Sequence, residues 1–149
     1  MLVHQVFAPG LIRTAKFLDF VDRAFGSQKE QYPEIEPILD WMEESVKNEK
    51  QAIFLCVDEA MDYTALMVMD AFRGPWNQQS GWVLFIYSED RESLRAVLSA
   101  ASDWGRSNGH SSCQAINQSV FHDDVYIRAM GYPGKVVGSF IRFELEKEN

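Results

Sequence analysis

Three apolar segments of strand length follow one another in the middle of the chain, and they constrain the fold more than any other feature. They span residues 52–57, 63–72 and 82–87. Turn residues at 58–62 separate the first two, which is typical of a β-hairpin. The third segment is too uniformly apolar for a strand with one solvated face, which indicates a sheet covered on both faces. The centre of the sequence therefore predicts antiparallel strands inside an α/β fold.

Segments with other periods surround this centre. Upstream, we expect a strand at 2–7, a helix at 11–25 and a second helix that begins near Pro33. Downstream, the acidic segment after Ser88 is typical of a helix start capped by that serine, and the helix is expected to end at Asn108–Gly109. A strand at 111–116, a helix at 122–130 and a strand at 135–145 complete the prediction. This order predicts one α/β domain over 1–149, with a mixed central sheet and helices on both faces.

Charge and hydropathy exclude several classes of function. The chain has 14 Lys+Arg against 22 Asp+Glu, a formal charge of −8, which is unsuited to gripping nucleic acid or anionic lipid. No apolar run approaches the ~20 residues needed to span a bilayer, and the first residues do not have the pattern of a secretory signal. Cys56 and Cys113 are expected to be buried thiols of a reducing compartment. These features predict a cytoplasmic protein.

The element order resembles that of the GCN5-related N-acetyltransferase (GNAT) superfamily. Residues 103–109, Asp-Trp-Gly-Arg-Ser-Asn-Gly, are similar to the end of the family's central helix, usually Trp-Ala-x-x-x-Gly. Residues 126–132, Tyr-Ile-Arg-Ala-Met-Gly-Tyr, are similar to its late Phe-Tyr-x-x-Leu-Gly-Phe segment, and 136–140 continue like its last strand. The resemblance covers about 50–145 by local sequence and 1–50 by element order, and it implies a GNAT-like fold.

The family binds acetyl-CoA at a Gln/Arg-x-x-Gly-x-Gly/Ala loop that opens the central helix. Backbone N–H groups there cradle the pyrophosphate, and small residues let it approach. With the register set on Trp104 and Gly109, the signature falls on Glu89, Glu92 and Leu94. Two of these residues are carboxylates and none is glycine. We therefore expect a degenerate loop with no bound cofactor, in which the acids stabilise the first turn of the helix.

The family's catalytic residues are also displaced. Its general acid, a Tyr four residues before the late Gly, corresponds to Ile127, and Tyr126 lies one residue away. The strand at 82–87 has no carboxylate to serve as base. The resemblance thus implies a non-catalytic binding or assembly subunit, of a kind familiar among tailed-phage proteins, including virion components. The alternative is an acetyl-CoA-dependent N-acetyltransferase acting on a cationic amine, with Tyr126 as acid and a water relayed by Glu89 or Asp58 as base.

The remaining candidate features concern partners and metals. Arg73 and Trp76 belong to a polar loop and are favoured interface anchors, although Trp76 is equally compatible with packing on the core. The acidic face of residues 34–44 is either solvated or meets a basic partner. We expect a protein partner or a homo-oligomer. No metal is expected, because His110, Cys113 and the acids near 122–124 match no tetrahedral ligand spacing.

Overall fold

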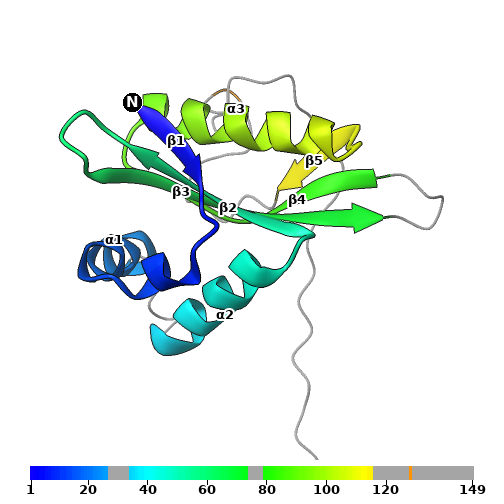
Figure 1. Ribbon diagram of the computed structural model, residues 1–149. Helices are drawn as coiled ribbons and strands as arrows, with labels where there is room; N and C mark the ends of the chain where they lie inside the picture. Colours follow the sequence, from blue (N-terminus) through cyan, green and yellow to red (C-terminus); the bar gives the residue numbers. More distant parts are fainter. Residues whose placement is uncertain (27–33, 74–78, 116–127, 129–149) are drawn as a thin grey trace, which may run out of the picture.

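The computed structural model describes residues 1–26, 34–73, 79–115 and 128. Within this part of the chain, five strands form one sheet in the order β1-β2-β3-β4-β5. The first four strands are antiparallel neighbours, and β4 and β5 are parallel. The strands are β1 (Leu2–Gln5), β2 (Gln51–Val57), β3 (Tyr63–Arg73), β4 (Gln79–Ser88) and β5 (Ser112–Ala115). The predicted mixed sheet is confirmed (Figure 1).

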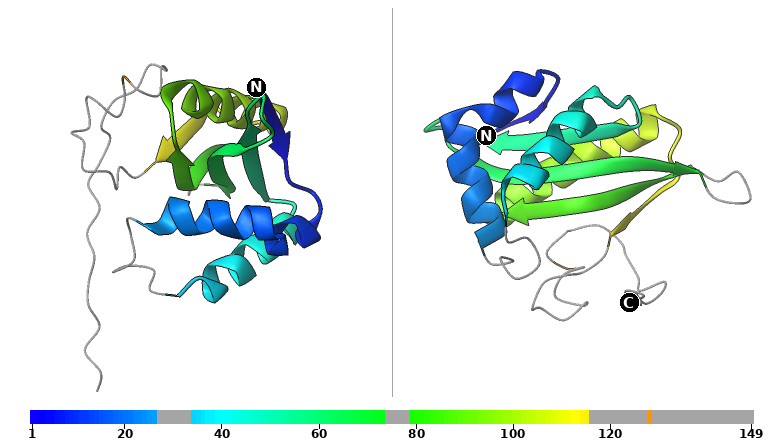
Figure 2. Two further views of the ribbon diagram at one scale, coloured as in Figure 1. Left: turned by 90° about the vertical axis from the view of Figure 1, so that its left-hand side faces the viewer. Right: turned by 90° about the horizontal axis from the view of Figure 1, so that it is seen from below.

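Helices cover both faces of the sheet. A 3₁₀ helix η1 (Pro9–Arg13) and the helices α1 (Ala15–Phe25) and α2 (Glu36–Lys47) lie on one face, and α3 (Arg91–Ser107) lies on the other (Figures 1 and 2). Among these described segments, no helix is long and apolar enough to cross a membrane.

Two hydrophobic cores follow from this arrangement. Successive side chains of a strand point to opposite faces of the sheet. Ile53 and Leu55 of β2 accordingly pack with α1 and α2, whereas Phe54 and Cys56 pack with α3. Both faces of the strand are covered, which explains the uniform apolar character of the central segments.

The acidic face of α2 has a partner within the chain. Arg13, at the end of η1, contacts the carboxylates of Glu36 and Asp40 at 2.6 and 2.5 Å and also binds Glu43. Hydrogen bonds to Glu43 and Glu36 raise the pKa of the Arg13 guanidinium above its usual range. Part of the acidic face of α2 therefore binds Arg13 and holds η1 against α2. The sequence pattern alone assigns this face to solvent or to a basic partner.

Several boundaries and one burial prediction were wrong. Helix α1 begins at Ala15, after η1, and α2 begins at Glu36 rather than near Pro33. Cys56 is buried as expected, but Cys113 is exposed near the start of the short strand β5. The elements expected at 122–130 and 135–145 fall outside the described residues, apart from Arg128.

Candidate functional site

A β-bulge interrupts β4 at Leu84. Val68 of β3 pairs with Phe85 and Met69 pairs with Val83, so Leu84 has no partner on β3. Because of this extra residue, Val83 packs in the core under α3 while Phe85 packs in the core under α1, although they are only two residues apart. Leu84 is 41% exposed. Bulges of this kind often lie beside functional sites, where they redirect side chains.

The helix that follows β4 is capped by its own carboxylate. Asp90 accepts a hydrogen bond from the Ser93 backbone N–H at 2.7 Å. The Ser93 hydroxyl lies 2.9 Å from the second Asp90 oxygen and 2.8 Å from the hydroxyl of Thr64, and Ser93 and Thr64 are both buried. The N-cap is therefore Asp90, and the expectation that Ser88 caps this helix was wrong.

The three residues on which the cofactor signature falls have different surroundings. Glu89 precedes the helix, and its carboxylate accepts a hydrogen bond from Arg23 Nε of α1 at 3.1 Å. Glu92 is exposed in the first turn of α3. Leu94 is half-buried and packs in the core under α3. Glu92 is thus placed to stabilise the first turn, whereas Glu89 instead links α1 to the end of β4.

An aromatic cluster adjoins the pair of Glu89 and Arg23. Tyr87, near the end of β4, meets the Phe20 ring edge-on at a centroid distance of 5.7 Å. Burial and the nearby Glu89 carboxylate raise the pKa of Tyr87, and Arg23 partly offsets this effect. Tyr87 therefore keeps its proton at neutral pH.

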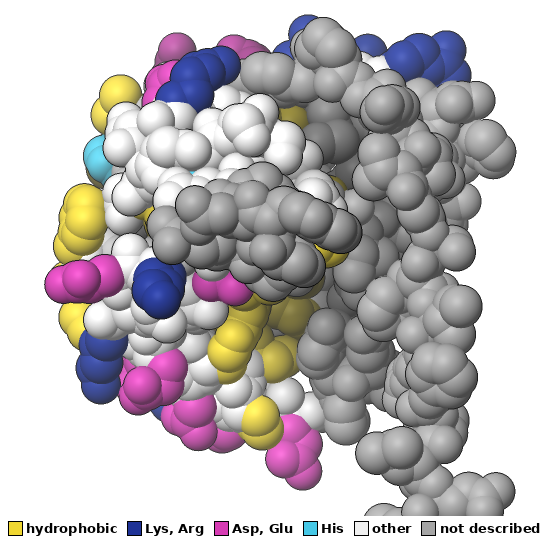
Figure 3. Space-filling view, turned by 90° about the vertical axis from the view of Figure 1, so that its right-hand side faces the viewer, with side chains coloured by type: hydrophobic (Ala, Val, Ile, Leu, Met, Phe, Trp, Pro, Cys, Tyr) yellow, Lys and Arg dark blue, Asp and Glu magenta, His cyan; other side chains and the backbone are white. Residues whose placement is uncertain are grey.

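The other candidate residues are only partly described. Asp58 holds the turn between β2 and β3, where its carboxylate accepts the Asp62 backbone N–H at 2.9 Å. Arg73 ends β3 opposite Gln79, but its side chain, Trp76 and Tyr126 lie outside the described residues. On the side shown in Figure 3, charged side chains of both signs are interspersed with apolar ones over the described residues.

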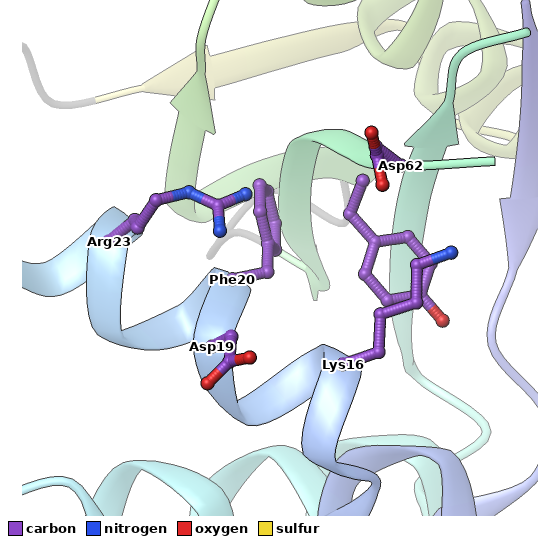
Figure 4. Close-up of a pocket in the computed structure, with 6 residues that line it drawn as sticks. Lys16, Asp19, Phe20, Arg23 and Asp62 are labelled. Carbon is purple, nitrogen blue, oxygen red and sulfur yellow. The ribbon is translucent and has the colours of Figure 1, made fainter. Parts of the chain in front are cut away.

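The structure also contains a pocket that sequence analysis missed. It has a volume of about 150 Å³ and lies between α1 and the start of β3 (Figure 4). Its lining side chains are Lys16, Asp19, Phe20, Arg23, Asp62 and Tyr63. The first four have the i, i+3, i+4, i+7 spacing of one helix face. That spacing is visible in the sequence, but the sequence does not indicate that Asp62 and Tyr63 lie across the pocket from it.

No metal centre is found in the part of the chain that the structure describes, where no group of three potential ligands comes together. His110 packs in a narrow space, with its ring edge-on to Trp104 at 5.3 Å. A Cβ atom added at Gly81 or Gly105 would lie 3.3 or 3.4 Å from His110 Nδ1. His110 therefore packs against Gly81, Trp104 and Gly105, and its buried Nδ1 has no hydrogen-bond partner among the described residues.

Comparison with known proteins identifies the fold. No family model matches the chain, and no curated protein sequence is significantly similar to it. The solved structures it resembles include a probable acetyltransferase (14% identity, TM-score 0.67, covering 99% of this chain and 100% of that one). A ribosomal-protein-alanine N-acetyltransferase from Brucella melitensis has 11% identity and a TM-score of 0.69, covering 96% and 100%.

A third solved structure is an aminoglycoside 6'-N-acetyltransferase from Acinetobacter baumannii, with 10% identity and a TM-score of 0.69, covering 97% of this chain and 99% of that one. Identities this low establish the fold and leave the activity open. Strand order, mixed pairing, helix placement and these likenesses agree, and the chain has the GNAT fold.

Proposed function

We propose that this protein is a GNAT-fold binding or assembly subunit that does not use acyl-CoA. The observation that carries the proposal is the Asp90 cap on α3, because that helix start is where the family holds the pyrophosphate. Its Ser93 N–H already has a carboxylate partner at 2.7 Å. The setting suggested by sequence, a tailed-phage component such as a virion protein, stays a prediction.

Electrostatics favours an unliganded helix start. A helix N-terminus stabilises an anion by ~0.3–2 kcal/mol. A phosphate brought to within ~4 Å of the Asp90 carboxylate would be repelled by ~1 kcal/mol in bulk water and by ~4 kcal/mol at the effective dielectric of a protein surface. Glu92, the second residue of α3, adds negative charge beside Asp90. At the effective dielectric of a protein surface, the repulsion of ~4 kcal/mol therefore exceeds the attraction of ~0.3–2 kcal/mol.

Isothermal titration with acetyl-CoA tests the proposal. We expect no saturable heat at millimolar acetyl-CoA, and micromolar affinity would overturn the proposal. Size-exclusion chromatography with light scattering and a pull-down test the assembly role. We expect a homo-oligomer or a recovered protein partner, whereas a lone monomer that captures nothing would contradict it.

The second candidate is an N-acetyltransferase acting on a cationic amine. Two of the similar structures are aminoglycoside acetyltransferases from soil metagenomic samples (TM-scores 0.70 and 0.66), and a charge of −8 attracts cations. Tyr126 would be the acid, with a water relayed by Glu89 or Asp58 as base. Release of free thiol from acetyl-CoA in the presence of polyamines, lost in Tyr126→Phe, would establish this activity.

A further inference from the structure

We propose that the pocket between α1 and β3 binds the ammonium or guanidinium group of a lysine or arginine side chain on a protein partner. The inference rests on the proposed binding function and names the chemistry of the partner. It concerns a pocket on the α1 side of the sheet, opposite α3 (Figure 1). Arg23 of this pocket pairs with Glu89, next to the Asp90 cap, but the two proposals concern different ligands. The two proposals can therefore be tested separately.

The size of the pocket suits the end of one side chain. Its volume of about 150 Å³ is close to that of a cavity that accommodates benzene. Lys16, Phe20 and Arg23 line it from α1, and Asp62 faces them from the turn before β3 (Figure 4). The pocket is partly open to solvent, so the rest of a partner chain can remain outside.

Aromatic rings form part of the wall, and both already attract cations. Phe20 and Tyr63 meet edge-on with centroids 5.8 Å apart. Lys16 Nζ lies 4.7 Å from the centre of the Tyr63 ring, and the Arg23 guanidinium lies 5.5 Å from that of Phe20. Cations are drawn to the faces of such rings by the ring quadrupole. The chain's own Lys16 already places an ammonium group over the Tyr63 ring.

The charged groups around the pocket favour the binding of a cation. Arg23 is paired with Glu89 outside the pocket. Among the described residues, neither the Asp19 nor the Asp62 carboxylate has an ion-pair partner within 4 Å, although both line the pocket. Within the pocket lining, Lys16 and Arg23 balance Asp19 and Asp62. Glu89, which pairs with Arg23 from outside the pocket, brings the net charge of these five residues to −1, in a chain of net charge −8. A cationic partner is complementary to both.

Lys16 is the group that a partner would displace. It is exposed, and its ammonium contacts the Met61 carbonyl and the Tyr63 ring rather than a carboxylate. A second ammonium can take its place on the ring while Lys16 turns into solvent. Replacing Lys16 by methionine keeps a long side chain but removes this competitor and its charge, so the variant should bind cations more tightly.

The test is an NMR titration with blocked tripeptides, Gly-Lys-Gly against Gly-norleucine-Gly, monitored at the amides of Asp62 and Tyr63. We expect saturable shifts with the lysine peptide and none with norleucine. The double variant Asp19→Asn/Asp62→Asn should weaken binding about fivefold, and Lys16→Met should tighten it about threefold. The matched control, Glu49→Gln/Glu59→Gln, changes the net charge equally at exposed positions that do not line the pocket and should leave the affinity unchanged.

Four results would overturn the inference: no saturation with the lysine peptide, equal binding of norleucine, equal weakening in the control variant, or no tightening in Lys16→Met. A titration with 1,4-diaminobutane distinguishes a protein partner from a small amine, and tighter binding of the free diamine would overturn the assignment to a protein. Failure of the peptide to bind leaves the acetyl-CoA titration unaffected, so the two proposals fail independently.

Discussion

Replacing Asp90 by alanine tests how much of the start of α3 depends on its own carboxylate. The variant loses the 2.7 Å bond to the Ser93 N–H and the 2.9 Å contact with the Ser93 hydroxyl. Loss of an N-cap aspartate costs ~0.5–2 kcal/mol. Among the described residues, the buried Ser93 hydroxyl then keeps Thr64 as its one partner, and the lost hydrogen bond adds ~0.5–1.5 kcal/mol. We expect the free energy of unfolding to fall by ~1–3 kcal/mol.

This change is measurable by thermal and urea unfolding followed by circular dichroism. For a chain of 149 residues, 1 kcal/mol corresponds to ~2–4 °C in Tm, so Asp90→Ala should melt ~2–12 °C below the parent. The matched control is Asp103→Ala, which removes an exposed aspartate whose ion-pair partner among the described residues is Arg106 on the same helix. Its Tm should fall by no more than about 2 °C.

The same melts repeated with acetyl-CoA connect stability to function. A ligand that binds only the folded state raises Tm. We expect no shift in the parent or in either variant, since Glu89 and Glu92 remain beside the helix start. If Asp90→Ala has the same Tm as the parent, the Asp90 carboxylate does not stabilise the helix start as inferred. If acetyl-CoA stabilises the parent, the helix start is a phosphate site after all.

Three further changes have defined outcomes. Glu89→Gln/Glu92→Gly should lower the unfolding free energy by ~0.5–2 kcal/mol, and a Tm at or above that of the parent would contradict this. Gly109→Ala should cost ~1–2 kcal/mol in urea unfolding, because Gly109 has a φ of 79° and a Cβ there would lie 2.9 Å from a Gln79 oxygen; the control Gly10→Ala, with open space around it, should cost less than half as much. Because burial raises the pKa of Tyr87 in the folded state, its stabilising contribution should be complete below pH ~10 and be lost as pH rises through the folded pKa. Over that pH range, the unfolding free energy of Tyr87→Phe should fall less than that of the parent. An equal fall in both proteins would show that Tyr87 does not make this contribution.

The central strands could be predicted from sequence almost to the residue. Segments expected at 52–57 and 63–72 became β2 (Gln51–Val57) and β3 (Tyr63–Arg73). Strands buried on both faces need apolar side chains at every position, so their pattern is visible without tertiary information. The third segment, expected at 82–87, extends to Gln79 because backbone pairing continues to Arg73 at the end of the hairpin. Backbone hydrogen bonds do not depend on apolar side chains.

The N-cap of α3 is a feature that the local sequence alone does not determine. Serine and aspartate are comparable N-cap residues, and Ser88 and Asp90 both precede the helix. Residue type alone does not distinguish them, and the acidic residues that follow Ser88 lead to the prediction that Ser88 is the cap. The choice follows from β4, which stays paired through Ser88 with Ala65 of β3. The strand therefore ends one residue later than expected, and the cap lies two residues later, at Asp90.

The sequence by itself determined the fold, through apolar periodicity and turn residues, and the excess of acid at the start of α3. Only the tertiary structure decided the partners of the charged groups. Arg23 and Glu89 are 66 residues apart, and Arg13 reaches α2 across 23 to 30 residues. Local patterns report which face of an element is buried. Which charged groups meet depends on how whole elements dock, and that is determined by core packing far from the charges themselves.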